Sequence, residues 1–166
     1  MMERKKVGFT YEVTQISPSG VVIAHEKVHN LIPTEGIKYI LNRIFVSETG
    51  QTWYIGAYTN SYTPVATDTM ASFVASSNET SDYSQATRPT FTPIIGSDNV
   101  SVTNTGSEAE FTFTVATRVT GLFISSNSAK QSTSGILLSA ALLTTAKQME
   151  VDGILRVNAG FTFASA

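Results

Sequence analysis

The sequence contains no cysteine, which excludes disulfides, thiolate nucleophiles and zinc sites built on cysteine. Charged residues are scarce as well. They make up 14% of the 166 residues, whereas an average globular domain has roughly 25%. Eleven basic and thirteen acidic residues give a formal net charge of −2, so the chain lacks the basic excess of nucleic-acid-binding proteins. We therefore do not expect nucleic acid as a partner.

Long apolar runs are also missing. The longest apolar-leaning stretch, residues 135–146, is interrupted by Ser139, Thr144 and Thr145, and it falls short of the roughly 20 residues needed to cross a bilayer. The basic start of the chain leads into alternating polar and apolar residues rather than into the apolar centre of a signal peptide. We therefore expect a soluble protein that does not contact a membrane.

Hydroxyl side chains replace the missing charges, because Ser and Thr together form about a quarter of the chain. A surface of hydroxyls with few charges gives little repulsion between molecules. This composition therefore favours a protein that works in an assembly. Thr is also a common strand residue, so an ordinary Thr-rich β domain explains the composition equally well. The length predicts one domain over residues 1–166 that needs no cross-links.

Alternation of polar and apolar residues predicts a mainly β chain. Residues 7–15 alternate from Val7 onward, and the turn residues 17–20 join them in a hairpin to a second strand at 21–29. Further strands are predicted at residues 51–59, 100–103, 108–116, 119–125, 136–143 and 155–163, the last with Phe161 and Phe163 in step. The stretch 136–143 also fits a helix. About eight short strands predict an antiparallel β-sandwich or flattened barrel.

One amphipathic helix is predicted after the second strand. Thr34 can cap its first turn, where Glu35 lies favourably against the helix dipole. Apolar residues then recur with helical spacing at Ile37, Ile40, Leu41, Ile44 and Phe45. We therefore expect this helix to pack on the sheet with its apolar stripe buried.

Residues 60–93 form a long polar segment, rich in Ser, Thr, Asn and Pro, with at most a short helical turn at 68–74. A segment of more than about 15 residues without regular structure is usually functional or is ordered by a partner. We predict it as a contact-making region. A loop that only wraps its own sheet is an equally open alternative.

Groups that could carry out chemistry are few. His25 and His29 lie about 13 Å apart along the second strand, which is too far to share one metal ion. The carboxylates of Asp68, Glu79 and Asp82 crowd the long segment, but they lack the spaced ladder of a calcium loop. No phosphate-binding loop, nucleophile elbow or zinc-hydrolase motif occurs in the sequence. We expect no metal, no cofactor and no enzymatic activity.

Aromatic residues cluster in and after the third predicted strand. Trp53 shares its face with apolar neighbours, which favours a core position. Tyr54, Tyr58 and Tyr62 are candidate partner contacts, because exposed aromatic rings stack on sugars and anchor protein interfaces. A carbohydrate-binding module is therefore one alternative function.

Short motifs run in order along nearly the whole chain. They lie at residues 29–32, 35–37, 53–56, 62–64, 66–69, 83, 86–89, 111–113, 121–123 and 134–137. Together they resemble a family of small structural proteins of tailed bacteriophages. The sequence departs from the family pattern at residues 149–154, where a longer turn leads into the last strand.

The resemblance implies a non-enzymatic virion component, made in the bacterial host cytoplasm, that binds the major capsid protein or other virion proteins. It favours a decoration or cement protein that stabilises the outer capsid shell. Attachment at the neck, tail or fibres is the alternative. We expect a homo-oligomer, a dimer or trimer closed by point symmetry.

The positions shared with the family have implied architectural roles. They are Asn30, Gly36, Trp53, Gly56 and Pro89, and the glycines are expected to allow close approach of another chain segment. Arg88 is expected either to tie the long segment down through carboxylates or carbonyls or to contact a partner.

Overall fold

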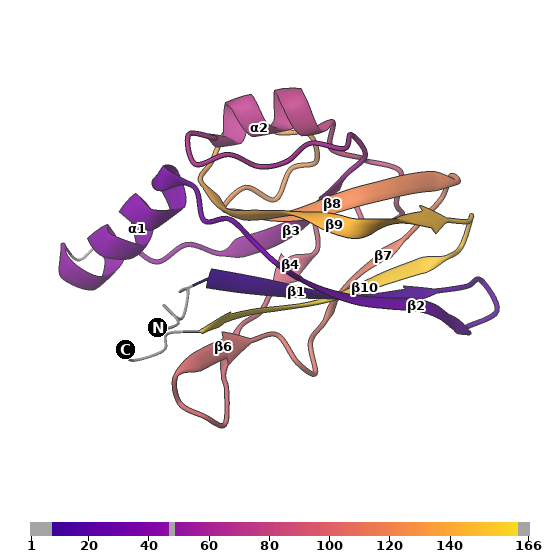
Figure 1. Cartoon of the computed structure of the whole chain (residues 1–166), viewed down its shortest axis with the longest axis horizontal. Coiled ribbons are helices and arrows are strands. Elements are labelled where there is room, and N and C mark those ends of the chain that lie inside the picture. The colour runs from indigo at the N-terminus through magenta and orange to yellow at the C-terminus, as the bar shows by residue number, and fades with distance from the viewer. Residues whose placement is uncertain (1–7, 47–48, 163–166) are drawn as a thin grey trace, which may run out of the picture.

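The structure is a computed structural model that describes residues 8–46 and 49–162. Within these residues, two antiparallel sheets pack face to face, and two helices lie outside them (Figure 1). The predicted mainly β fold is confirmed, and of the two predicted forms the sandwich is the one observed. No helix of the described part is long and apolar enough to span a membrane.

The first sheet is built around the pairing of β1 with β10. Its strand order is β2-β1-β10-β6-β5, and β7 also pairs with β10. The strands are β1 (Gly8–Ile16), β2 (Val22–His29), β5 (Ile94–Ile95), β6 (Ser101–Thr103), β7 (Ala109–Thr112) and β10 (Ile154–Thr162). β1 and β10 pair from Gly8 opposite Thr162 to Ile16 opposite Ile154. Val7 and Phe163, which the sequence pattern adds to these strands, lie outside the described residues.

The second sheet has the order β4-β3-β8-β9. Its strands are β3 (Trp53–Tyr58), β4 (Thr90–Phe91), β8 (Thr117–Ser125) and β9 (Leu137–Met149). The ambiguous stretch 136–143 is therefore a strand, and it continues to Met149. Between Leu142 and Lys147 the pairing of β9 with β8 shifts register, so this part of β9 bulges away from its neighbour.

The alternation of the strands decides which side chains enter the core. On β1, Phe9, Tyr11 and Val13 are buried, and on β10 the residues opposite them include Val157 and Phe161. Each large apolar side chain buried in this way contributes about 1.5–3 kcal/mol. The core between the sheets therefore follows directly from the period of two in the sequence.

The long polar segment is ordered and carries a second helix, α2 (Met70–Ser77), where at most a short turn was expected. Thr69 and Ser72 form a reciprocal capping box at its start. Met70 and Phe73 then enter a second apolar cluster, with Tyr58 among its members, on the outer face of the second sheet (Figure 1). The segment therefore covers its own sheet.

The first helix, α1 (Thr34–Phe45), forms where the sequence predicts it but does not lie on a sheet face. It sits at the end of the sandwich, next to β9 (Figure 1). Ile37 and Leu41 are 46% and 50% exposed, so the predicted burial of the stripe is wrong for them, whereas Ile40 is partly buried. The side chains of Ile44 and Phe45 are outside the described part.

Contacts with other segments hold the first turn of α1. The N-cap is Pro33, without a side-chain hydrogen bond, so the expected Thr34 cap is wrong. Glu35 instead accepts hydrogen bonds from the amides of Met70, which begins α2, and Leu137, which begins β9. Thus one carboxylate joins both helices to the second sheet.

Candidate functional site

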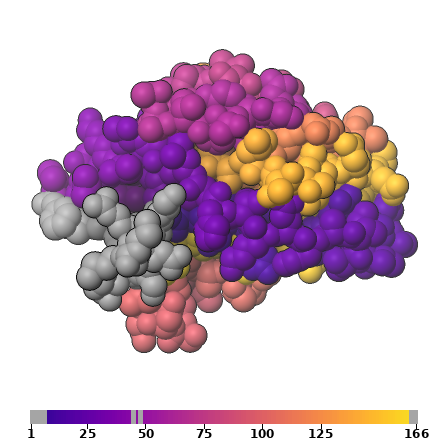
Figure 2. All heavy atoms as spheres, viewed as in Figure 1, coloured from indigo at the N-terminus to yellow at the C-terminus, as the bar shows by residue number. Residues whose placement is uncertain are grey.

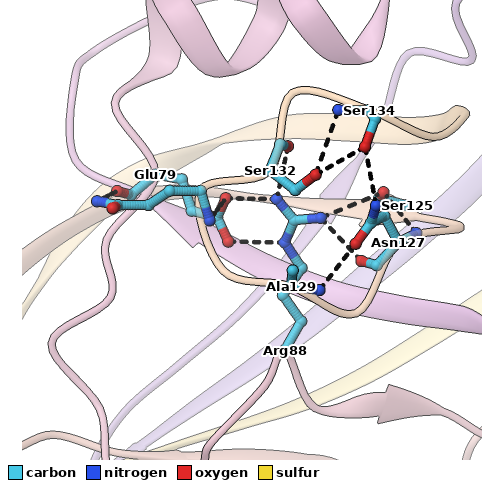
Figure 3. Close-up of polar contacts among 8 residues, drawn as sticks. Glu79, Arg88, Ser125, Asn127, Ala129, Ser132 and Ser134 are labelled. Carbon is cyan, nitrogen blue, oxygen red and sulfur yellow. Dashed lines mark hydrogen bonds and ion pairs between the residues drawn. The ribbon is translucent and has the colours of Figure 1, made fainter.

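A buried ion pair between Arg88 and Glu79 fixes the long polar segment (Figure 3). Both side chains are fully buried. The Arg88 guanidinium donates from Nε to Glu79 Oε1 at 2.8 Å and from Nη2 to Glu79 Oε2 at 2.6 Å. It also donates to the carbonyls of Asn127, at 2.8 Å, and Ser132, at 3.1 Å. The bidentate pairing of the Arg88 guanidinium with the Glu79 carboxylate is the strongest arrangement available to these two groups.

The Arg88–Glu79 pair also joins the long polar segment to the loop between β8 and β9. The Gln131 amide donates to Glu79 Oε2 at 2.8 Å, so the loop between β8 and β9 also binds the carboxylate. Beside it, the Lys130 ammonium donates to the carbonyl of Tyr83 at 2.7 Å and lies 3.8 Å from the centre of the Tyr83 ring. Arg88 therefore ties the segment down through a carboxylate and carbonyls, as predicted. Its complete burial makes the alternative, a partner contact through this side chain, wrong.

The three candidate tyrosines occupy different environments. Tyr58 is fully buried, its hydroxyl donates to the carbonyl of Tyr62, and burial raises its pKa. Its prediction as a partner contact is therefore wrong. Tyr62 is partly buried and donates to Asp68 Oδ1 at 2.8 Å, which engages its polar end within the chain. Tyr54 is also partly buried, and a contact through it stays a prediction.

Trp53 packs against the edge of the main core without being fully buried. Its ring meets that of Tyr39 edge to face, with 5.0 Å between the ring centres. Tyr39 belongs to α1, so this pair joins the helix to β3. The core position predicted for Trp53 is therefore correct in part.

The other predicted architectural residues hold neighbouring segments. Asn30 accepts a hydrogen bond from the Phe9 amide at 2.7 Å, and the carbonyl of Pro89 accepts one from the Ile55 amide at 2.8 Å. A Cβ at Gly36 would lie 2.5 Å from the Leu138 carbonyl oxygen, and one at Gly56 would overlap the ring of Phe123. The expected close approach at both glycines is confirmed.

The carboxylates of the long segment bind different partners. Asp68 accepts hydrogen bonds from the Tyr62 hydroxyl and the Val65 amide. Glu79 pairs with Arg88, and Asp82 accepts a hydrogen bond from the Thr117 hydroxyl. Among residues 8–46 and 49–162, no group of three His, Asp or Glu side chains could hold a metal ion. Of the two histidines, His25 lies 2.9 Å from Glu12 on the surface, and His29 is exposed.

One end of the sandwich, here called the hairpin end, exposes branched apolar side chains. They are 49–58% exposed and comprise Val21, Val22, Ile23, Val115 and Val151. Val21, Val115 and Val151 come from the β1–β2, β7–β8 and β9–β10 connections, and Val22 and Ile23 are the first residues of β2. Ile16 pairs with both Val22 and Ile154, and the Asp152 amide donates to the Phe113 carbonyl, so the three turns are neighbours.

The hairpin end was not apparent from the sequence. The alternation that predicts a strand over 108–116 continues only to Thr112, and Val115 lies in the turn that follows. In Figure 2 the tip of the hairpin, coloured as residues near 20, lies beside the yellow segment at the right of the molecule. Exposed apolar patches mark surfaces that bind other proteins.

The opposite end holds an apolar groove of about 860 Å³, here called the α1 groove. It lies between α1 and the last pairs of the β1–β10 ladder. Its apolar lining consists mainly of Phe9, Leu31, Ile32, Ile37, Ile40, Leu41 and Phe161. The exposed halves of Ile37 and Leu41 therefore belong to a concave surface rather than to a flat one.

Along one side, Glu26 of β2 ties the two sheets together. Its carboxylate accepts hydrogen bonds from the amides of Thr144 and Thr145 and from the Lys147 ammonium, where β9 has left β8. Desolvation alone would raise the pKa of Glu26, but the bonds from Lys147 and Thr144 outweigh it, so the pKa lies below its ordinary value.

The hairpin end and the α1 groove are two candidate contact surfaces at opposite ends of the β1–β10 ladder. The ion pair of Arg88 and Glu79 is buried beneath the long polar segment and belongs to neither surface. Comparison with family models, curated proteins and solved structures finds no match to the chain.

Proposed function

We propose that this protein is a non-enzymatic structural protein of a tailed-bacteriophage particle, a decoration protein that binds the outer capsid shell and stabilises it. The observation that carries the proposal is the hairpin end, where Val21 precedes the edge strand β2 and Val22 and Ile23 begin it, all three exposed. Proteins seldom leave such a row uncovered, because it invites association. Its partner in this proposal is the major capsid protein.

The rigid support beneath the hairpin end favours this role. β1 runs from the hairpin through the whole sandwich, paired with β10 along its full length. A preorganised contact surface loses little entropy on binding, so a small patch can bind usefully. A shell also repeats the same site many times, and an oligomer that grips neighbouring subunits gains effective concentration.

The oligomer in this proposal is a dimer or trimer closed by point symmetry, because closed contacts fit the local axes of a shell whereas open ones form filaments. Light scattering of the purified protein measures this directly. The low charge of the chain and the resemblance of its motifs to small phage structural proteins support the same assignment.

The decisive experiment adds purified protein to phage particles assembled without it and counts the bound copies. We expect many copies per particle and a higher temperature of genome release. The double variant Val22→Ser/Ile23→Ser should bind at least about tenfold more weakly, because each exposed apolar side chain contributes about 1 kcal/mol when it is covered.

A matched control is available on the other edge of the same sheet. Ile94→Ser/Ile95→Ser removes two adjacent apolar side chains that are 53% and 67% exposed but lie away from the hairpin end. This variant should bind like the unaltered protein. Label found only at the portal vertex or tail would favour the neck or tail alternative, and an absence of binding by the unaltered protein would refute the proposal.

A further inference from the structure

We infer that the open edge of β2 binds an extended, acidic segment of a partner protein, which adds to the first sheet as a further strand. β2 is the outermost strand of this sheet and pairs only with β1 in the described part. An unpaired edge presents backbone N–H and C=O groups to which another strand can hydrogen-bond. The inference does not rest on the proposed function, because it concerns the chemistry of the bound segment and not the assembly that supplies it.

The register of β2 identifies the backbone groups at this edge. The Asn30 amide donates to the carbonyl of Phe9, and the pairing of β2 with β1 continues in step from there. Hydrogen-bonded and non-hydrogen-bonded pairs alternate along two antiparallel strands. Every second residue of β2 therefore turns its backbone groups toward β1, while His25, Lys27 and His29 turn theirs toward the open edge.

The same three residues place basic side chains on the outer face of the sheet. Side chains two positions apart in a strand share a face, so the three form one row. All three are exposed. Glu12 of β1 lies opposite Lys27, but its carboxylate is 2.9 Å from His25, and Lys27 forms no ion pair within the described residues. A strand added at this edge would therefore lie beside a basic row.

The basic row distinguishes between the strands that could add to β2. Opposite charges on neighbouring strands are stabilising, whereas like charges directly opposite each other are destabilising. Two copies of this protein that paired through β2 would bring their basic rows together. A segment with acidic residues at alternate positions would instead place its carboxylates beside Lys27 and the two histidines. Charge complementarity therefore favours the acidic segment over a second copy.

The open edge is continuous with the hairpin end. The exposed Val22 and Ile23 are the first two residues of β2. A segment that runs along the edge reaches them at one of its ends. The bound segment is therefore expected to be acidic along most of its length and apolar at that end.

The test uses a peptide of the length of β2, eight residues, in which glutamate alternates with valine. A control peptide has lysine in place of each glutamate. Amide hydrogen exchange of the full-length protein is measured with each peptide. The glutamate peptide, at about ten times its dissociation constant, should slow exchange at the amides of His25, Lys27 and His29 by roughly tenfold. The lysine peptide should leave these amides unchanged.

Substitutions at Lys27 separate the charge from the backbone. Lys27→Glu should weaken binding of the glutamate peptide by roughly tenfold and let the lysine peptide bind, because the charge at the centre of the row is reversed. Lys38→Glu makes the same change at an exposed position of α1 and should alter neither result. Lys27→Pro removes an amide that faces away from β1, so the sheet should form but strand addition should be lost. If Lys27→Pro does not fold, Lys27→Glu with the two peptides provides the test.

Three outcomes would overturn the inference. Equal protection by both peptides would mean that the edge binds strands without regard to charge. Protection by neither peptide would mean that the basic row only protects the edge against association. Slow exchange of the edge amides in the protein alone, lost on dilution, would mean that a second copy covers the edge. None of these outcomes changes the number of copies bound to phage particles, so the two proposals can fail separately.

Discussion

The two connections that carry helices are attached to the sandwich in opposite ways. The connection with α1 has the more regular amphipathic pattern, yet Leu41 remains half exposed. The connection with α2 has the weaker pattern, yet Met70 is buried and the Arg88–Glu79 pair holds the segment from within. The difference teaches that helical periodicity predicts a helix, while burial depends on the surface that the rest of the chain presents.

Breaking the ion pair should have the largest effect on stability. Arg88→Ala leaves the Glu79 carboxylate buried without its partner, which should lower the free energy of unfolding by about 3–5 kcal/mol. Urea denaturation measures this loss. Arg118→Ala, at an exposed position of β8, is the control and should change it little. Equal effects would show that the pair does not anchor the α2 connection.

Truncating one apolar side chain in each helix tests the comparison directly. Met70→Ala should lower the free energy of unfolding by about 2–5 kcal/mol, because it leaves a cavity in the second apolar cluster. Leu41→Ala should cost only about 1 kcal/mol, since half of this side chain is already exposed. A loss at Leu41 as large as that at Met70 would contradict the difference.

Acid should loosen the β2 side of the sandwich, from which the α1 connection departs. Because the pKa of Glu26 is lowered in the folded protein, its contribution is complete above the unfolded value of about 4.3 and is lost as the pH falls through the folded value. Melting temperatures between about pH 5 and 3 should therefore fall more steeply for the unaltered protein than for Glu26→Gln. Parallel curves would show that Glu26 does not tie the sheets.

The smallest effect is expected at an exposed ion pair. Arg156 Nε lies 2.8 Å from Glu110 Oε1, and both side chains are more than 40% exposed. Arg156→Gln should change the free energy of unfolding by about 0–1 kcal/mol in urea denaturation. A loss close to that of Arg88→Ala would mean that burial is not what distinguishes the two pairs.

Much of the fold could be predicted because alternation is a local signal. The predicted strands at 7–15, 21–29 and 155–163 match β1, β2 and β10 closely in their described parts. The two-residue strands β4 and β5 could not be predicted, since such short strands exist only through pairing with distant partners. For α2 only a short turn at 68–74 was predicted, because its small and polar residues form a full helix only when they pack beside a sheet.

The contact surfaces were harder to predict than the fold. Arg88 was expected to bind carboxylates or carbonyls, but the choice of Glu79 depends on how the segment turns back on itself. Val22 and Ile23 look like core residues of a strand, and their exposure depends on their position at an edge and beside two other turns. Such information is tertiary, and no local pattern in the sequence contains it.

The pairing of Gly8 with Thr162 places the first and last described residues of the chain side by side. A short linker joining these positions would close the backbone into a ring, which could then be opened elsewhere without altering any layer of the sandwich. The exposed turn at residues 97–100, between β5 and β6, is a suitable place to open it. A permuted chain of this kind would carry its new ends on a different face, from which a fused cargo could be presented.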